Sequence, residues 1–387
     1  MTVEVSSDLR GADPETVRAA IECRDPLPGT SGFAGFLDGR LVRDVLGREP
    51  LYVEADAVAV DEAGGLPPET WAFEPTRLED PELVPAGCAI DASGAQRLWS
   101  LPEPDAAEPS ESDGSCEEAD RSALLEDLER GIESAIADAR SAHDDVAVAF
   151  SGGVDSAIVG ELLDAPLYVV GFPGSADVEA AREAAEAMGR ADDLTVVTLD
   201  LDALERAVPT VARAIGRTNA MDVGIALPLY LVAERAAADG RDALAIGQGA
   251  DELFGGYEKV VHLDHRVEAD SVRGAVREQI ETLPEQLPRD VLAIRAAGVE
   301  PVAPFLHDAV VDPALRLPSD LLADEAERKR ALRRIASAHL PESVAGREKK
   351  AVQYGSLVAR ELDRLARRAG YKRRIGDHVT KYVESRL

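Results

Sequence analysis

Residues 146–156 read VAVAFSGGVDS, and this short stretch is the clearest indication of the fold class. The apolar run VAVAF, rich in valine, predicts a strand that is buried on both faces. SGGVDS at 151–156 then leads into AIVGELLD, whose apolar spacing predicts a helix. A buried strand, a glycine-rich turn and a helix form the first half of a βαβ unit.

The same alternation continues towards the C-terminus. LYVVGF (167–172), LTVVTLD (194–200) and DALAIG (242–247) predict three more buried strands, and the segments between them have helical periodicity. We therefore expect an α/β fold with a doubly wound parallel sheet, right-handed crossovers and helices on both faces. Beyond Asp251 the strand signals fade, and the C-terminal part is predicted to be helical.

The N-terminal part has a different pattern. Residues 1–104 consist of short apolar runs broken by glycine and proline, with period-two alternation in places, which predicts a small β-rich domain. The stretch LPEPDAAEPSESDGSCEEADRS (101–122) has almost no apolar residues, so we expect an acidic linker over 105–122. The parallel-sheet domain would then occupy residues 123–387.

Composition limits the class of protein. The chain has 387 residues with a net charge of −31, and 45% of its residues are hydrophobic, which is enough for a packed core. Such a negative surface disfavours nonspecific binding of nucleic acids. The sequence shows no membrane span and no secretory signal, and its three widely spaced cysteines fit neither a disulfide framework nor a zinc site. We expect a cytoplasmic protein.

Only six of the 42 basic residues are lysines. Many acids, few lysines and many small residues are typical of a halophilic protein adapted to molar salt, where a Debye length of about 3 Å screens the repulsion between the acids. The alternative is an acidic surface that recruits a basic partner.

Two loops at predicted strand ends carry unusual chemistry, and ligands of open parallel sheets bind beyond the carboxyl ends of the strands. In the loop 151–156, two glycines allow close approach of the backbone, two serines offer hydroxyls, and the following helix offers its N-terminus, which together suit a phosphate. Asp155 fits that site if Mg²⁺ lies between the carboxylate and the phosphate. The second loop, GQGADELFGGY (247–257), adds Asp251, which could share the metal. The alternative is two glycine turns with ordinary helix caps.

These motifs resemble a known family. SGGVDS matches the SGGxDS pyrophosphate-binding loop of the PP-loop ATP pyrophosphatases, and GQGADELFGGY is similar to the GEGxDExFGGY signature of the asparagine synthetase C-terminal domain. Residues 171–189, 221–231, 301–321 and 329–356 resemble further stretches of that family in the same order. The resemblance covers about residues 123–356 and implies a PP-loop fold that uses ATP and Mg²⁺. It also implies small-molecule substrates: aspartate or another carboxylate, which is adenylated, and ammonia or another amine.

The resemblance also implies roles for individual residues. The pyrophosphate would be held by Ser151, Gly152, Gly153 and Ser156. Mg²⁺ would be bound by Asp155 and Asp251, and adenine and ribose would be bordered by Val170 and by the backbone of Ile246 and Gly247. Lys349 matches the family lysine that neutralises charge as pyrophosphate leaves, and Lys350 is the alternative for that role.

Two positions depart from the family pattern. Gln248 stands where the family has a glutamate thought to accept a proton from the attacking amine, and an amide cannot act as a base. The amine step then uses another base, or the acceptor differs, or Gln248 only orients the substrate. His307 stands where the family often has aspartate, which hints at a changed substrate pocket.

Residues 32–53 and 71–104 resemble the last third of the class II glutamine amidotransferase domain, so the N-terminal part is similar to a truncated remnant of it. Thr2 stands where that domain has its catalytic cysteine, and the glutamine-binding loops have no counterpart. Cys23 and Cys88 are internal and cannot use a terminal amine as base. We expect no glutaminase activity; a role of Thr2 as a terminal nucleophile is the alternative.

Three functional hypotheses follow. The first is an ATP-dependent, AMP-forming amide ligase similar to asparagine synthetase. The second keeps the ATP site but adenylates a different carboxylate or a tRNA base, with the basic cluster 366–376 either in contact with that substrate or paired with the acidic surface. The third is a nucleotide-binding relative without catalysis. HLDH at 262–265 is interpreted as a solvated helix face and not as a metal site.

Overall fold

The computed structural model describes residues 7–55, 66–91, 93–103, 114–261, 267–347, 355–373 and 376–387. The chain forms two compact units. The first comprises Met1–Asp138, Gln248–Pro288 and Ala303–Ile335, and the second comprises Ala139–Gly247, Arg289–Val302 and Ala336–Leu387. The division between units therefore does not coincide with the boundary that we expect at residue 123.

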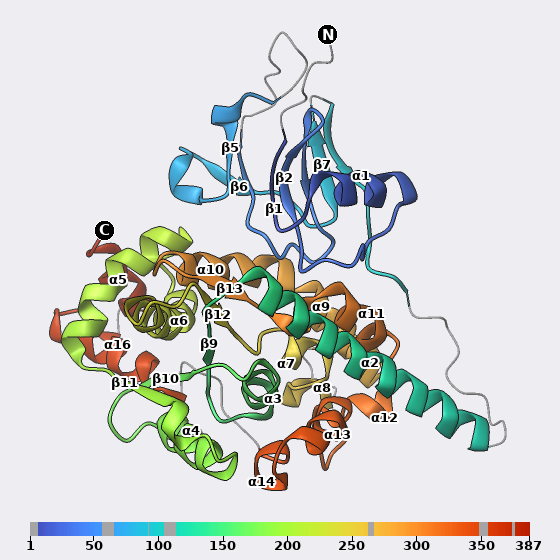
Figure 1. The fold of residues 1–387 in the computed structure, drawn as a ribbon. Coiled ribbons are helices and arrows are strands. Elements are labelled where there is room, and N and C mark those ends of the chain that lie inside the picture. The colour runs from blue at the N-terminus through green and yellow to red at the C-terminus, as the bar shows by residue number, and fades with distance from the viewer. Residues whose placement is uncertain are drawn as a thin grey trace. The chain divides into compact units, whose positions relative to one another are not determined.

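The second unit contains a five-stranded sheet in the order β11-β10-β9-β12-β13, and every neighbouring pair is parallel (Figure 1). The strands are β9 (Val146–Ala149), β10 (Leu167–Gly171), β11 (Leu194–Thr198), β12 (Ala243–Ala245) and β13 (Glu300–Val302). The α/β class and the four predicted strands are confirmed. β13 is not predicted from the sequence, because it has three residues and contains Pro301, which is tolerated at the edge of a sheet.

The strand order shows where a ligand site is expected. The chain winds outwards from β9 through β10 to β11 and then returns to add β12 on the other side of β9. The direction of winding thus reverses between β9 and β12, which pair in register with Val148 opposite Ala245. Such a reversal is the topological switch point at which doubly wound sheets bind their ligands.

Helices connect these strands. They are α3 (Val154–Leu163), α4 (Ala176–Ala187), α5 (Leu201–Ile215) and α6 (Ala220–Ala238), with α14 (Glu342–Ala345), α16 (Val358–Arg368) and α17 (His378–Glu384) nearer the C-terminus. In α5, Asp200 caps the first turn and accepts a hydrogen bond from the N–H of Ala203 at 2.7 Å. Its buried face includes Leu204, Val208 and Val211, and full burial of each such side chain contributes about 1.5–3 kcal/mol.

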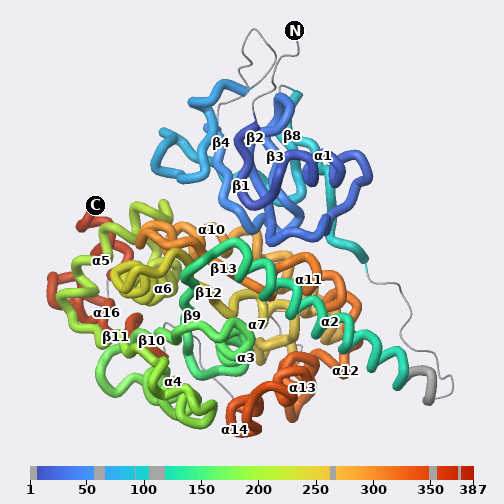
Figure 2. The backbone as a smooth tube through the Cα atoms, viewed as in Figure 1, coloured from blue at the N-terminus to red at the C-terminus, as the bar shows by residue number. Residues whose placement is uncertain are grey.

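The first unit begins with antiparallel strands (Figures 1 and 2). One sheet has the order β1-β2-β3-β7-β8 and a smaller one the order β5-β4-β6. The strands are β1 (Asp8–Arg10), β2 (Ala34–Leu37), β3 (Arg40–Arg43), β4 (Tyr52–Glu54), β5 (Trp71–Ala72), β6 (Pro81–Leu83), β7 (Cys88–Asp91) and β8 (Gly94–Arg97). A cluster that includes Leu41, Leu51 and Phe73 is buried among them. The N-terminal part is therefore rich in short strands.

The other elements complete the chain. They are α1 (Pro14–Cys23), α2 (Gly114–Ala142), α7 (Ala250–Leu253), α8 (Glu258–Val261), α9 (Val272–Glu281), α10 (Leu283–Arg295), η4 (Pro304–Leu306), α11 (Asp308–Leu315), α12 (Ser319–Leu322) and α13 (Arg330–His339), with short 3-10 turns at 68–70, 75–77 and 191–193. Helix α2 corrects one prediction. It begins at Gly114, so residues 114–122 of the predicted acidic linker are helical. Extending a helix is easier than nucleating one. The helix that the apolar pattern after Ala123 predicts therefore extends back into the acidic stretch.

Candidate active site

The loop between β9 and α3 has the backbone of an anion site. Gly153 occupies the N-cap of α3 and offers no side-chain acceptor, so no side chain caps the first N–H groups of this helix. Gly152 has φ +74°, and a Cβ there would collide with the carbonyl group of Ala180 in α4, at 2.6 Å from its carbon. Only glycine fits this position, so helix α4 fixes the path of the loop.

The two serines of this loop contact each other. The Ser151 N–H donates to Ser156 Oγ at 3.1 Å, the two hydroxyl oxygens lie 3.0 Å apart, and the Ser156 hydroxyl donates to the carbonyl of Gly153 at 3.2 Å. Ser156 is 3% exposed, whereas Ser151 is half-buried. Ser156 therefore closes the loop on itself, and Ser151 is the hydroxyl that a ligand reaches more easily.

The chain that follows β12 lies directly on the first turn of α3. A Cβ on Gly247 would come within 2.8 Å of Asp155 Cβ and 3.2 Å of Ser156 N. The N–H of Ile246 donates to Val302 O at 2.8 Å and continues the pairing of β12 with β13. The loop after β9 and the chain that follows β12 therefore meet at Gly247. Val170 and Ile246 are buried at the ends of their strands, and contact of their backbone with adenine and ribose stays a prediction.

The second loop contains an ion pair that the sequence analysis missed. Lys329 Nζ lies 2.7 Å from Asp251 Oδ1, and the lysine side chain is 10% exposed whereas that of Asp251 is 47% exposed. Lys329 also has φ 58°, a backbone conformation that is rare for a residue with a side chain. Lys329 is one of only six lysines in the chain, and this scarcity is the signal that could have found it.

Glu252 anchors the same loop from inside. Its side chain is buried, and the Tyr257 hydroxyl donates to its Oε1 at 2.5 Å. Burial raises the pKa of Glu252, and the neighbouring charge of Asp251 raises it further. Gln248 is half-buried at the start of this loop, and its side-chain amide cannot act as a general base. Asp155 and Asp251 belong to different compact units, so their use of one Mg²⁺ stays a proposal.

His307 has a structural task in the fold. Its Nδ1 accepts a hydrogen bond from the N–H of Ala309 at 3.1 Å and so caps α11. The ring proton must then lie on Nε2, which is 3.1 Å from Asp138 Oδ2. Burial lowers the pKa of His307, and the nearby charge of Arg48 lowers it further, whereas Asp308 and Asp138 act in the opposite direction. A cap explains this residue without a changed substrate pocket.

Lys349 and Lys350 lie outside the described residues, but the residues on either side of 348–354 are described. Arg347 donates to the Ala180 carbonyl at 2.9 Å and to Glu183 at 3.0 Å. The Ser356 carbonyl accepts from the N–H of Phe172 at 3.1 Å. Both flanks thus bind α4 or the turn before it, and Ala180 is the residue that packs against Gly152.

The donor set suits a metal that arrives with its substrate. Among the described residues, no group of three or more His, Cys, Asp or Glu side chains is placed to hold a metal ion. Mg²⁺ commonly takes one or two carboxylates and completes its shell with phosphate oxygens and water. Asp155 on the first turn of α3, beside the glycine cradle, fits that pattern.

The remaining candidates add little. Thr2 and the HLDH stretch (262–265) lie outside the described residues. Cys23 is an exposed free thiol and Cys88 a buried one. In the basic cluster, Arg373 binds Asp363 at 2.7 Å, which favours pairing with the protein's own acids. None of the helices in the described ranges is both long and apolar enough to cross a membrane.

Comparison with known proteins agrees with this geometry. The family model described as asparagine synthase matches residues 127–292 and 265–378. A putative glutamine-hydrolyzing asparagine synthetase of Methanocaldococcus jannaschii is 30% identical over 290 residues, which cover 65% of this chain and 53% of that protein. Asparagine synthetase B of Escherichia coli, also glutamine-hydrolyzing, is 31% identical over 187 residues, which cover 47% of this chain and 33% of that protein.

This chain thus spans about half the length or less of the curated relatives that it matches. The family match nevertheless extends over well more than half of the chain and includes the loops 151–156 and 247–257 and the flanks of Lys349. The chain belongs to the asparagine synthase family.

Proposed function

We propose that the chain is an ATP-dependent, AMP-forming amide ligase that converts aspartate and ammonia to asparagine. One observation carries the proposal: Gly247, at the end of β12, packs on Asp155 in the glycine loop after β9. This contact lies at the switch point of a doubly wound parallel sheet, beside an uncapped helix N-terminus that suits a phosphate. Membership in the asparagine synthase family supports the same reaction class.

The first step is adenylation of the acceptor. A carboxylate oxygen of the acceptor forms a bond to the α-phosphorus, and the bond between the α-phosphorus and the bridging oxygen to the β-phosphorus breaks. The N–H groups at the start of α3 and the Ser151 hydroxyl would bind the leaving pyrophosphate, and Asp155 and Asp251 would hold Mg²⁺. The metal supplies neutralisation of the phosphate charge. Lys349 would provide a fixed cation for the charge that develops on pyrophosphate.

The second step is amide formation. The amine nitrogen bonds to the acyl carbon, AMP leaves, and the nitrogen loses a proton. Gln248 cannot accept that proton, so it would orient the acyl-adenylate while solvent or the departing AMP takes the proton. We also propose that the chain does not hydrolyse glutamine. Cys23 and Cys88 are internal, and Cys88 is buried, so neither suits the nucleophile of a glutaminase.

The test is release of pyrophosphate and AMP. Purified protein in concentrated KCl is incubated with ATP, Mg²⁺, ammonium and a panel of amino acids. Release that depends on aspartate is the expected result. Asp155→Asn should abolish it, whereas Asp164→Asn, a control at the other end of α3 with its carboxylate 87% exposed, should not. No release with any amino acid would refute the proposal.

Gln248 favours one second candidate, a ligase that adenylates a different carboxylate or a tRNA base. Gln248 is the loop position that we expect beside the acyl-adenylate, and there it places an amide where the family has a carboxylate. Release of pyrophosphate with another acceptor, and not with aspartate, would support that candidate. ATP binding without release under any condition would support a nucleotide-binding protein without catalysis.

A further inference from the structure

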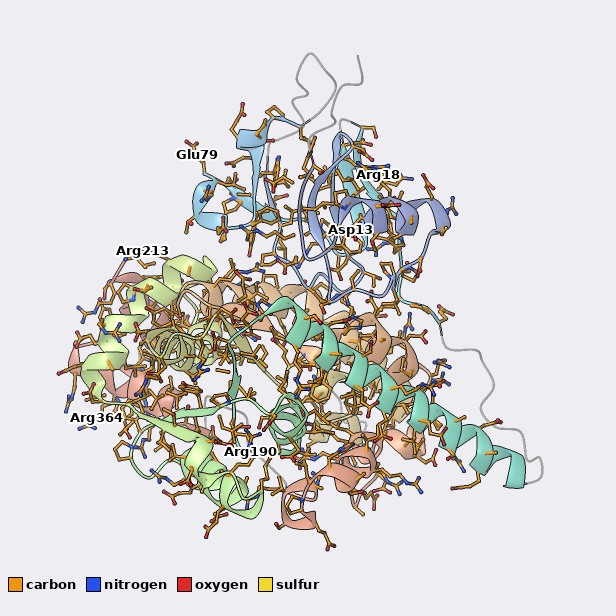
Figure 3. The ribbon with its side chains drawn as sticks, in the orientation of Figure 1. Asp13, Arg18, Glu79, Arg190, Arg213 and Arg364 are labelled. Carbon is orange, nitrogen blue, oxygen red and sulfur yellow. The ribbon has the colours of Figure 1, made fainter. Side chains whose placement is uncertain are left out.

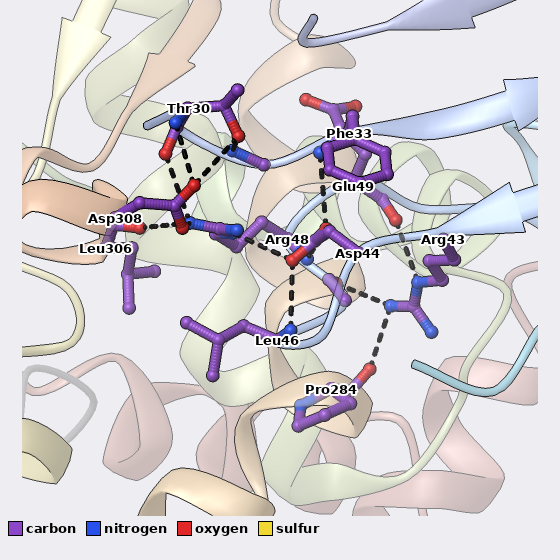
Figure 4. A network of polar contacts seen from close by, with 12 residues as sticks. Thr30, Phe33, Arg43, Asp44, Leu46, Arg48, Glu49, Pro284, Leu306 and Asp308 are labelled. Carbon is purple, nitrogen blue, oxygen red and sulfur yellow. Dashed lines mark hydrogen bonds and ion pairs between the residues drawn. The ribbon is translucent and has the colours of Figure 1, made fainter. Parts of the chain in front are cut away.

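A buried ion network connects the β-rich segment to a distant stretch of the same unit (Figure 4). Arg48, between β3 and β4, is 4% exposed; its Nε donates to Asp44 Oδ1 at 2.8 Å and its Nη1 to Asp308 Oδ1 at 2.6 Å. Burial alone lowers the pKa of Arg48, but the attraction of Asp44 and Asp308 outweighs it and raises the pKa. The guanidinium is thus a buried cation between two carboxylates, and loss of one member leaves a buried charge uncompensated.

The network also fixes backbone. Arg48 Nη1 donates to the carbonyl of Leu306 at 2.7 Å, across 258 residues of sequence. Three hydrogen bonds join Thr30 and Asp308. The Thr30 N–H and hydroxyl donate to Asp308 Oδ2 at 2.8 and 3.2 Å, and the Asp308 N–H donates to the Thr30 carbonyl at 2.9 Å. The turn η4 and the residue that starts α11 are therefore held by the β-rich segment at several points.

Turn η4 packs against the loop 247–257, which is the second of the two proposed ligand loops. A Cβ on Gly249 would lie 2.5 Å from Leu306 Cδ2 and 3.7 Å from Phe305 Cβ. The Phe305 ring packs edge-on against Phe254, with centroids 5.9 Å apart. Gly249 has φ +90° and stands one residue after Gln248 and two before Asp251. The Leu306 side chain thus lies directly against Gly249, and a displacement of Leu306 would reach Gly249 through this contact.

We infer that Arg48 is a positioning residue for the second ligand loop. It holds Leu306 and Asp308, Leu306 holds Gly249, and Gly249 sets the places of Gln248 and Asp251. The β-rich segment then has a task in the ligase reaction that requires no glutamine hydrolysis. The inference rests on the proposed function for what Gln248 and Asp251 do, and on contacts within one compact unit for how they are placed.

The first test needs no catalysis. Arg48→Lys keeps the charge but cannot span Asp44, Asp308 and the Leu306 carbonyl with one nitrogen. In the full-length protein we expect amide hydrogen exchange over 249–256 to become about tenfold faster or more, with exchange in α3 unchanged.

Arg43→Lys is the matched control. Arg43 is equally buried, but it donates to the carbonyls of Gly47, Glu49, Val84 and Pro284 and not to residues 304–308. This variant should lose stability without faster exchange over 249–256. Arg18→Lys, on the exposed face of α1 (Figure 3), should change neither property.

The second test is the Mg²⁺ dependence of ATP binding and of pyrophosphate release. Arg48→Lys should raise the Mg²⁺ concentration for half-saturation by about tenfold, because loss of a residue that supports a metal ligand weakens metal binding by 10–100-fold. The KM for ATP at saturating Mg²⁺ should stay unchanged, since the loop 151–156 is not displaced. A merely structural role would not produce that split.

The outcomes separate the two proposals. Three outcomes would overturn the positioning role even if the wild type is an active ligase. In the first, hydrogen exchange over 249–256 is unchanged in Arg48→Lys, and in the second it changes equally in Arg43→Lys. In the third, exchange in Arg48→Lys is faster but the Mg²⁺ dependence is unaltered. If the wild type neither binds ATP nor releases pyrophosphate, the proposed function fails, and the exchange comparison alone decides whether Arg48 positions the loop.

Discussion

Replacement of Gly152 by alanine tests the glycine cradle without touching a catalytic group. The new Cβ would lie 2.6 Å from the carbonyl carbon of Ala180 and nearer still to its oxygen, so the loop and α4 must separate by at least about 0.8 Å to reach ordinary contact at 3.4 Å. Gly174, in the turn before α4, is the matched control. It has the same φ of +74°, but a Cβ there would meet nothing within 4 Å.

Both variants place an alanine in the left-handed backbone conformation, but only Gly152→Ala also collides with Ala180. The left-handed conformation costs an alanine roughly 1–2 kcal/mol at either position. The collision with Ala180 adds roughly 1–3 kcal/mol at Gly152 alone, as in an overpacked core. We therefore expect Gly174→Ala to lower the free energy of unfolding by about 1–2 kcal/mol and Gly152→Ala by about 2–5 kcal/mol.

The functional consequence should differ more than the stability. A shift approaching 1 Å in a group that binds the reacting phosphates reduces the rate by about 100-fold. Urea denaturation in concentrated KCl measures the stability, and pyrophosphate release at saturating ATP measures the rate. If Gly152→Ala denatures like Gly174→Ala and releases pyrophosphate at the wild-type rate, the loop 151–156 is not the phosphate site that we propose.

Three further predictions follow. Lys349→Ala should abolish pyrophosphate release and Lys350→Ala should largely preserve it; the reverse result would move the catalytic role to Lys350. Gln248→Glu should raise the rate of amide formation at low ammonium concentration because it restores a base, and an unchanged rate would mean that this position only orients substrate. The wild type should lose stability as the pH falls below about 6.5, because the lowered pKa of His307 means that the unfolded chain binds the proton first. His307→Asn keeps a helix cap and should reduce this loss in pH-dependent denaturation, whereas an identical pH profile would contradict the assignment.

The parallel sheet could be predicted because β9, β10 and β12, in its middle, are almost fully buried and therefore form unbroken apolar runs. β11, at the edge, is half-buried, but its sequence is still a short apolar run. β13 lacks such a run, since its three residues include a proline at the sheet edge. The start of α2 at Gly114 was hidden by acidic composition that is also typical of linkers. The local sequence pattern thus predicted the strongly buried elements. It missed β13, which forms beside β12, and the start of α2, which extends the helix that follows it.

The site shows the same limit. Glycines and acids at strand ends identified the loops 151–156 and 247–257, because position relative to a strand is visible in sequence. The pairing of Lys329 with Asp251 joins residues far apart in the chain, and no spacing rule reports such a contact. The Arg48 network has the same character: only the fold brings Asp308 to it.

The central claim is that a carboxylate is adenylated before the amide forms. The most direct measurement uses ¹⁸O in both carboxylate oxygens of the amino acid that supports pyrophosphate release, followed by mass spectrometry of the nucleotide product. Transfer of the carboxylate oxygen to the α-phosphorus predicts AMP that carries one ¹⁸O. Unlabelled AMP, or ADP together with ¹⁸O-labelled phosphate, would contradict it.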